Sequence, residues 1–189
     1  MTEHSEVPTD PSEFACVDFV NSAFSDHVGR GTATDRLESP QWRRWFLDRY
    51  DLTPDDPGAP PFGELAALRR NIRRILHKWS EGEPLSRRDV RYLDERTSGA
   101  PVRLRVAQDP DGVDLRHEPV TRSWAWVIAG VAASAVELLR DGEPARLKTC
   151  GNPDCSWVFY DNTISRTRRF CSATPCGSLM RVRRFRQRA

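Results

Sequence analysis

The arrangement of cysteines constrains the fold of this chain more than any other feature. Four of its five cysteines fall between residues 150 and 177, in two pairs of the form C-x4-C with fifteen residues between the pairs. Unrelated buried cysteines would rarely take two equal spacings so close together. Four neighbouring thiolates are typical of a tetrahedral zinc site in which protein side chains fill every ligand position. We therefore predict a metal site formed by Cys150, Cys155, Cys171 and Cys176.

Disulfide bonds and an iron–sulfur cluster are two other interpretations of the four cysteines. Disulfides persist mainly in exported proteins, whereas the N-terminal sequence MTEHSEVPTDPSEF is acidic and polar and lacks the apolar segment of a signal peptide. The most apolar run, residues 124–136, is shorter than the ~20 residues that a bilayer span requires. We therefore expect a cytoplasmic chain without a membrane segment, which disfavours disulfides. An iron–sulfur cluster stays open as the minor alternative, because it also uses four thiolates.

The local sequence around each pair predicts how the ligands are presented. A tight turn through Gly151, Asn152 and Pro153 can direct the first two sulfurs at one point, between two short strands. The second pair precedes a terminal helix, for which we expect Thr174 as the cap and Pro175 at the first helical position. Knuckle, hairpin and helix together form a treble-clef-like zinc finger. Four protein ligands leave no position for water or substrate, so the zinc is expected to be structural.

Positive charge is concentrated in the same part of the chain. Residues 141–189 carry 10 Lys and Arg against 4 Asp and Glu, whereas residues 1–140 carry 19 against 23. The planar guanidinium group donates paired hydrogen bonds to phosphate, and such asymmetry is typical of a nucleic-acid-facing segment. On the expected terminal helix, Leu179, Val182 and Phe185 form a stripe suited to packing on the finger. The alternative to a nucleic-acid partner is a solvated basic helix without a partner. The nucleic-acid candidates are Arg166, Arg168, Arg169, Arg181, Arg183, Arg184, Arg186 and Arg188.

The preceding residues predict a mainly α domain with a small β-hairpin, so the fold class is α+β, mainly α. Ser39 and Pro40 give a helix start signal, and apolar residues at intervals of three and four predict a helix over 63–82. Alternation on both sides of an Asp-Pro-Asp-Gly turn predicts a hairpin over 101–120, with Val102, Leu104 and Val106 on one face. Further helices are expected over 85–98 and 124–142, and residues 14–24 are expected to form a largely buried helix or a short mixed element. Cys16 is expected to pack in the core.

The chain resembles the ABATE and CGNR zinc-finger family of bacterial proteins, whose members are described as stress-induced transcription regulators. The segment CGNPDCSWVFYDNTISRTRRFCSATPCG, followed by RVRRFR, carries the resemblance to the finger, and CVDFVNS resembles the family's N-terminal signature. The resemblance implies a helical sensing or ligand-binding domain at residues 1–143, a zinc finger at 144–189, structural Zn²⁺ and DNA as partner. Cys176-Gly177-Ser178-Leu179 departs from the family's Cys-Gly-Asn-Arg, so a contact made through that Asn-Arg pair should be altered.

The chain therefore predicts a regulator rather than an enzyme. His4, His27, His77 and His117 lie in no recognisable catalytic setting, and neither a P-loop nor a dinucleotide fingerprint is present. Asp18 and Asn21 are candidate ligand-binding residues for a small-molecule or protein effector, because polar groups in an apolar segment need partners. A buried structural role for the two is the alternative. DNA is the expected partner, an RNA-binding or protein-interaction zinc module is the alternative function, and a homodimer would suit a palindromic site.

Overall fold

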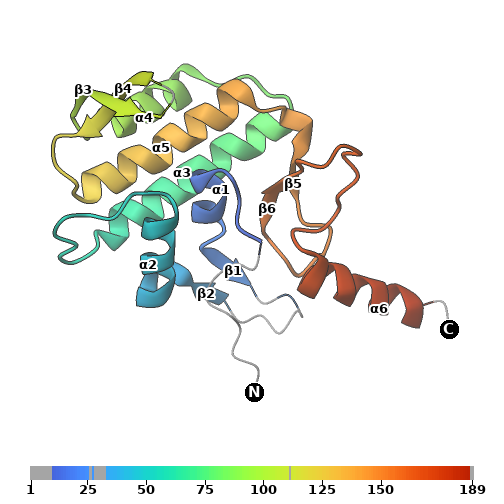
Figure 1. Cartoon of the computed structure of the whole chain (residues 1–189). Helices are drawn as coiled ribbons and strands as arrows, with labels where there is room; N and C mark the ends of the chain where they lie inside the picture. Colours follow the sequence, from blue (N-terminus) through green and yellow to red (C-terminus); the bar gives the residue numbers. More distant parts are fainter. Residues whose placement is uncertain (1–9, 26, 28–32, 111, 188–189) are drawn as a thin grey trace.

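The structure is a computed structural model, which describes residues 10–25, 27, 33–110 and 112–187. These residues form a mainly helical body with three small two-stranded antiparallel sheets (Figure 1). The expected fold class, α+β and mainly α, is therefore confirmed. In chain order the elements are α1 (Ala15–Val20), β1 (Ala23–Ser25), β2 (Ala33–Asp35), η1 (Arg36–Glu38), α2 (Pro40–Arg49), α3 (Phe62–Ser80), α4 (Arg87–Thr97), β3 (Val102–Asp109), β4 (Gly112–Pro119), α5 (Trp124–Asp141), η2 (Pro144–Arg146), β5 (Leu147–Thr149), β6 (Val158–Tyr160), η3 (Ala173–Gly177) and α6 (Ser178–Arg186).

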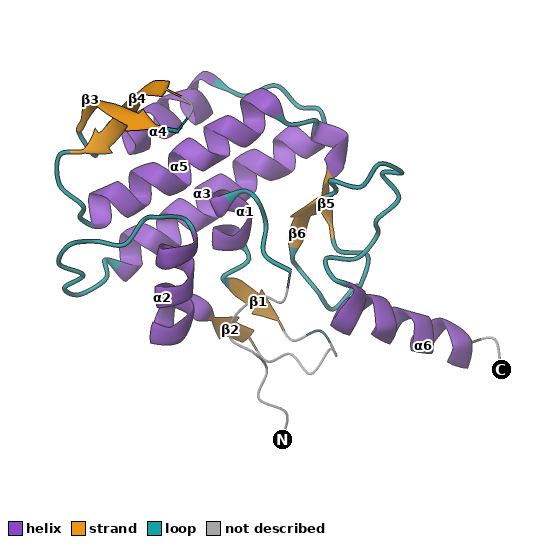
Figure 2. Cartoon of the chain, viewed as in Figure 1, coloured by secondary structure: helices purple, strands orange, loops and turns teal. Residues whose placement is uncertain are grey.

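The core of the body lies where α1, α3 and α5 meet (Figure 2). Helix α3 turns one apolar stripe inward, as expected for a helix with apolar residues three and four positions apart. Helix α5 is apolar over most of its circumference and buries residues on several sides. A Cβ on Gly130 of α5 would lie 2.3 Å from Leu52 Cδ2, so glycine lets the segment after α2 approach the helix.

Two helix starts follow from side-chain caps. Ser39 Oγ accepts a hydrogen bond from the Trp42 amide at 3.1 Å, and Pro40 occupies the first turn of α2, as predicted. At α4, Ser86 Oγ accepts from the Asp89 amide while the Asp89 carboxylate accepts from the Ser86 amide. This reciprocal pair satisfies two amides that have no partner within the helix.

The segment 14–24 is a short mixed element, which is one of the two forms predicted for it. Helix α1 ends at Val20, and Ala23–Ser25 forms β1, which pairs with β2. The physical reason for this end of the helix is that Asn21 turns its side chain toward β6, and the chain then pairs with a strand that shows no apolar alternation in its sequence.

The predicted hairpin forms from β3 and β4, which pair in a register that places Val106 opposite Leu115. It stands beside α4 at the margin of the helical body (Figure 1). Val102, Leu104 and Val106 share one face, as predicted, and all three side chains are exposed.

The C-terminal residues are joined to the helical body by the sheet β5–β6. Leu147 of β5 belongs to the main core, and Val158 and Tyr160 of β6 pack against that core. Helix α6 projects away from the rest of the molecule (Figure 1). In the part of the chain that the structure describes, none of the helices combines the length and apolar character that a membrane crossing requires.

The start of the terminal helix differs from the expectation. Helix α6 runs from Ser178, after the π-helix η3, whereas Pro175 is expected at its first position. Thr174 has an extended backbone, and its hydroxyl approaches Ser178 Oγ at 3.4 Å instead of capping an amide. The apolar stripe packs only in part, because Leu179 is half-buried whereas Val182 and Phe185 are 47% and 73% exposed on the projecting helix.

Candidate metal centre

The first pair of cysteines is held by a tight turn at the tip of β5–β6. The Cys155 amide donates to the Asn152 carbonyl at 2.9 Å, and the Cys150 amide donates to the Trp157 carbonyl at 2.8 Å. The Gly151 amide donates to the Arg169 carbonyl, also at 2.8 Å, which ties this turn to the second cysteine loop. A Cβ on Gly151 would lie 2.9 Å from that carbonyl oxygen. The position therefore needs glycine for close approach of two backbone segments.

The second pair comes from the segment that leads into α6. Arg168 braces this segment, since its guanidinium donates to the carbonyls of Phe170 and Cys171 and lies over the Phe159 ring at 4.8 Å. Arg183 of α6 forms an ion pair at 2.5 Å with Asp154, which lies in the turn between Cys150 and Cys155. The helix and both cysteine loops are therefore fixed to one another by arginine side chains.

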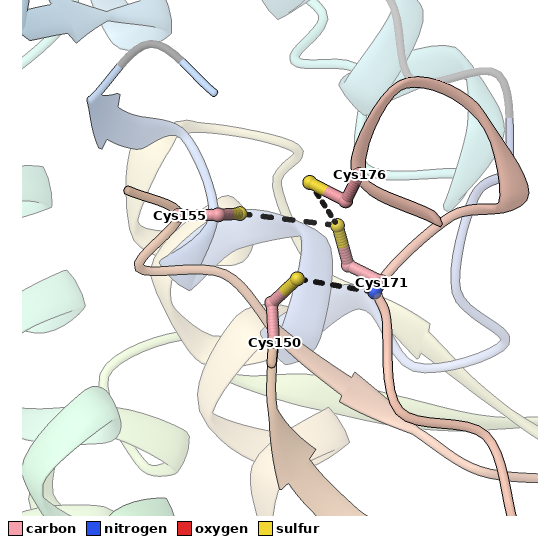
Figure 3. Close-up of side chains that lie close together, drawn as sticks. All are labelled: Cys150, Cys155, Cys171 and Cys176. Atoms are coloured by element: carbon pink, nitrogen blue, oxygen red, sulfur yellow. Dashed lines mark hydrogen bonds between the residues drawn. The ribbon is translucent and has the colours of Figure 1, made fainter. Parts of the chain in front are cut away.

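The four predicted ligands converge (Figure 3). Their sulfur atoms all lie within 4.8 Å of one another, and all four residues are buried. Cys155 Sγ lies 3.9 Å from Cys171 Sγ, which in turn lies 3.7 Å from Cys176 Sγ. Four sulfurs placed ~2.3 Å from one ion at the corners of a tetrahedron would be about 3.8 Å apart. None of the cysteines forms a disulfide, so this donor set fits a structural Zn²⁺ site. The expected structural zinc cofactor is thus supported by the geometry.

The electrostatics of the cluster also call for a cation. Hydrogen bonds from the neighbouring thiols, first that of Cys155, lower the pKa of Cys150 to about 6. Hydrogen bonding to Cys150 raises the pKa values of Cys155 and Cys171 far above the usual thiol range. A thiolate in this cluster is thus stabilised only while its neighbours stay protonated. A bound Zn²⁺ removes that conflict, because it allows all four sulfurs to ionise together.

Two groups outside the four ligands contact Cys176, and the sequence did not predict either contact. Asn152 is fully buried, and its Nδ2 lies 2.9 Å from the His27 carbonyl and 3.6 Å from Cys176 Sγ. His27 Nδ1 lies 3.4 Å from the same sulfur, and its ring meets Trp157 edge to face. Such outer contacts orient a metal ligand. Because His27 lies 149 positions before Cys176, nothing in the local sequence pattern indicates this pair.

The loop between β6 and Cys171 is organised around a buried carboxylate. Asp161 accepts hydrogen bonds from Lys148 Nζ at 2.6 Å, from the Thr163 hydroxyl and amide, and from the Arg168 amide. These hydrogen bonds, first that of Lys148, outweigh the effect of burial and hold the pKa of Asp161 well below its usual range. Lys148 Nζ also donates to the Arg166 and Arg168 carbonyls. The ion pair therefore fixes the backbone from which Arg166, Arg168 and Arg169 project.

The structure divides the predicted nucleic-acid residues into two groups. Arg166, Arg168 and Arg183 form ion pairs with Glu143, Asp10 and Asp154. Among the described residues, no hydrogen bond or ion pair engages the side chains of four exposed arginines, which we call the free arginines: Arg169, Arg181, Arg184 and Arg186. Arg188 lies outside the described residues. Three of the free arginines, Arg169, Arg181 and Arg184, line a cavity of about 440 Å³ beside Phe170 and Gly177.

Both candidate effector residues form hydrogen bonds with other parts of the chain, Asp18 within the helical domain and Asn21 with the finger. Asp18 Oδ2 accepts hydrogen bonds from Tyr50 Oη at 2.6 Å and from the Ser12 amide at 3.1 Å. The Asn21 side chain exchanges two hydrogen bonds with the backbone of Val158. Both residues line a cavity of about 70 Å³ between α1 and β6. Their assignment to an effector stays a prediction, and the contacts seen here are structural.

The remaining cysteine lies apart from the metal centre. Cys16 is fully buried in the main core, and its amide donates to Ser134 Oγ at 3.2 Å. Burial raises the pKa of its thiol to about 12. Cys16 is therefore a neutral packing residue.

The fold and the cluster together define a helical domain joined to a four-cysteine structural zinc finger. Comparison with protein families agrees with this class. Residues 13–142 match the ABATE family, described as "Putative stress-induced transcription regulator", and residues 146–189 match the CGNR zinc finger. The chain belongs to the ABATE family. Curated proteins yielded no match to this sequence.

Proposed function

We propose that this protein is a DNA-binding transcription regulator, in which the zinc finger contacts backbone phosphates and the helical domain responds to an effector. The observation that carries the proposal is the position of the free arginines. Arg169 projects from the loop before Cys171, and Arg181 and Arg184 project from α6, so two separate elements of the finger present guanidinium groups to one cavity.

The charge around this cavity favours a polyanion. Among the residues that the structure describes, Asp10 is the one acidic residue in its lining, and it is paired with Arg168 at 2.9 Å. Within the described part of the chain, the three free guanidinium groups therefore have no carboxylate that neutralises them. Phosphates bound there would remove the repulsion among them and would accept paired hydrogen bonds from each planar group. Because α6 projects from the body, a long polymer can reach it without contacting the helical domain (Figure 1).

Duplex binding measured by fluorescence anisotropy over a series of salt concentrations tests this proposal. The logarithm of the association constant should fall linearly with the logarithm of salt, by ~0.9 for each phosphate neutralised. The triple variant Arg169→Gln, Arg181→Gln, Arg184→Gln should reduce that slope by up to about 3. The matched control is Arg87→Gln, Arg88→Gln, Arg91→Gln, which removes the same charge from exposed positions of α4.

Each outcome of that experiment is decisive. Equal loss in the two triple variants would mean that net charge alone drives the association, and it would overturn the assignment to the finger. An association constant that does not change with salt concentration would also contradict phosphate binding. Competition with structured RNA and with single strands separates the alternatives: preference for RNA would favour an RNA-binding module, and no retention on any nucleic acid would favour a protein-interaction module.

For the effector, we propose a second cavity in the helical domain. It has a volume of about 410 Å³ and lies among the beginning of α3, the end of α4 and the beginning of α5. That volume is within the range of small-molecule sites, ~300–1,000 Å³, whereas the 70 Å³ cavity beside Asp18 and Asn21 holds little more than ordered water.

The polar chemistry of the larger cavity suggests the class of effector. Arg96 lines it beside Trp124 and Ile128, and the buried Arg96 Nε has no hydrogen-bond partner among the described residues. A buried donor without a partner is costly, and a hydrogen-bond acceptor would satisfy it. Glu64 and Glu95 also line the cavity and would repel a free carboxylate, so we propose a small, largely apolar and uncharged molecule with one acceptor group as effector. Thermal-shift screening of such molecules should give stabilisation that Arg96→Met abolishes, and stabilisation that survives this substitution would place the effector elsewhere.

A further inference from the structure

The hairpin β3–β4 has an apolar face that no other described element covers. Its two strands hydrogen-bond only to each other within the described sheets, so the hairpin is not extended by a third strand. Residues of one face alternate along both strands, in accordance with the two-residue period of a strand. Five aliphatic side chains on this face are between 46% and 77% exposed: Val102, Leu104, Val106, Val113 and Leu115.

The charged side chains of the hairpin that the structure describes lie on the opposite face, where they form ion pairs with one another. Glu118 lies 3.5 Å from Arg103 and 3.4 Å from Arg105, and Arg116 lies 3.1 Å from Asp114. By the strand register, the aliphatic face is completed by Gln108, His117 and Pro119. It therefore holds no lysine, arginine, aspartate or glutamate, and a nucleic acid would find no fixed positive charge on it.

An isolated two-stranded hairpin is marginal in water, and hairpins gain stability when an apolar face packs against another layer. Single exposed aliphatic residues are normal, but a contiguous set of five is typical of an interaction surface. The aliphatic face of β3–β4 thus has the features of a surface that a second apolar surface covers.

We propose that this face binds the same face of a second copy of the chain. In a two-fold contact the same surface of both copies forms the interface. A face that carries charges of one sign would therefore be repelled by the same face of the partner. The aliphatic face of β3–β4 avoids that repulsion because its fixed charges all point the other way. Two such hairpins stacked face to face, about 10 Å apart, would interdigitate their aliphatic side chains as two sheets do in a β-sandwich.

The size of the surface predicts a reversible dimer. Five half-exposed aliphatic side chains offer on the order of 500 Å² in each copy, hence about 1,000 Å² for the pair, which is the lower limit for a specific interface. The hairpin lies beside α4, on the opposite side of the helical body from α6 (Figure 2). Dimerisation would therefore leave both zinc fingers accessible, and it does not depend on what the fingers bind.

Sedimentation velocity of the zinc-loaded full chain, from about 1 to about 200 μM, tests the proposal over the range expected for a weak interface. We expect a concentration-dependent shift from monomer to dimer in the wild type. Val106→Lys places an ammonium group at the centre of the aliphatic face, and it should weaken the dimer by more than about tenfold. The matched control is Ala107→Lys, which adds the same charge one residue further along β3, on the charged face opposite Asp114. That control should dimerise within about twofold of the wild type, because its new charge points away from the interface.

The proposal fails if the wild type stays monomeric over this range, or if Val106→Lys dimerises as well as Ala107→Lys. Val106 is 74% exposed in the monomer, so its replacement should leave the fold intact, which circular dichroism and the zinc content verify. Leu115→Lys, on the strand opposite, repeats the test at the residue that faces Val106 in the register. If neither lysine variant weakens the dimer, the interface lies elsewhere and the proposal is overturned.

Discussion

Asn21, at the end of α1, forms two hydrogen bonds with the backbone of Val158 in β6. Its Nδ2 donates to the Val158 carbonyl at 2.7 Å, and its Oδ1 accepts from the Val158 amide at 3.0 Å. One side chain of the helical domain therefore provides for β6 the pair of hydrogen bonds that a neighbouring strand would provide. Arg73 of α3 adds to this contact, since it donates both to the Val20 carbonyl and to the Ser156 carbonyl. The finger is docked on the helical domain through these polar groups.

The first prediction concerns this contact. Asn21→Asp keeps the shape of the side chain but replaces the donor that faces the Val158 carbonyl with an acceptor. We expect a loss of about 1–3 kcal/mol in the free energy of unfolding, because a buried carbonyl loses its partner and meets a carboxylate instead. Urea unfolding followed by tryptophan fluorescence measures the change. Asn71→Asp is the control, since its side chain bonds the Ala67 carbonyl and Tyr92, both of which belong to the helical domain. An equal loss of stability there would mean that the contact with β6 contributes no more than a contact within the helical domain.

The second prediction concerns pH and Asp18. Burial is the main cause that raises the pKa of Asp18 to about 6, above the value of ~3.9 expected in the unfolded chain. The folded state therefore holds the proton more tightly. The resulting stabilisation is fully present below about pH 4 and is lost as the pH rises through about 6, with a total of roughly 3 kcal/mol.

Asp18→Asn imitates the protonated side chain at every pH. Its oxygen can still accept from Tyr50 and Ser12, so we expect a gain in stability of up to roughly 3 kcal/mol at pH 8 and about half of that gain at pH 5, where the wild type has lost only part of the stabilisation. Chemical denaturation of the wild type and the variant at both pH values measures the difference. A variant that is destabilised equally at pH 5 and pH 8 would mean that the ionisation of Asp18 has no part in the pH profile.

The third prediction concerns the metal. We expect one Zn²⁺ per chain by elemental analysis, and loss of the native finger when a chelator removes it, because zinc supplies ~10–16 kcal/mol to comparable small modules. Cys176→Ser should abolish stoichiometric zinc. Cys16→Ala, which removes a thiol outside the cluster, should lower stability but leave the zinc content unchanged. Protein that stays fully folded and metal-free after chelation would refute the structural zinc site.

The parts of this molecule that could be predicted from sequence are those in which the causal residues lie near one another in the chain. The two C-x4-C pairs identify the four sulfurs because each pair needs only a short turn to present them. Ser39 and Pro40 locate the start of α2, because a cap acts within a single helical turn. The hairpin β3–β4 follows from a turn sequence and a two-residue alternation, both of which are local.

The parts that could not be predicted depend on distant partners. Asn21 and Val158 are 137 positions apart, and a side chain that bonds to backbone leaves no pattern in the partner's sequence. Nothing in the sequence distinguishes the C-terminal arginines from one another. In the structure, Arg168 pairs with Asp10 and Arg183 pairs with Asp154. Arg169, Arg181 and Arg184 stay exposed and line the cavity. The apolar positions of α6 match a packed stripe in sequence, but packing needs a surface, and the projecting helix provides none for Phe185.

The last prediction concerns Lys148 and Asp161, which hold the loop that carries Arg169. Asp161 is fully buried, whereas the Lys148 side chain is partly exposed. Removing the lysine leaves a buried carboxylate without its cation, and breaking such a pair typically costs about 3–5 kcal/mol. Because Asp161 keeps its hydrogen bonds from Thr163 and Arg168, we expect Lys148→Met to fall near the lower end, about 3 kcal/mol. The loop should also exchange its amide hydrogens faster, which hydrogen-exchange mass spectrometry of residues 161–170 detects.

The matched control is Arg140→Met, which breaks the exposed ion pair between Arg140 and Asp141. Solvent screens that pair and both partners stay hydrated after the change, so we expect no measurable effect on stability or exchange. The double variant Lys148→Met, Asp161→Asn removes the unpaired charge and should recover much of the lost stability, since the cost in the single variant comes mainly from the isolated carboxylate. If the double variant were no more stable than Lys148→Met alone, the lysine would act through its bonds to the Arg166 and Arg168 carbonyls rather than through its charge.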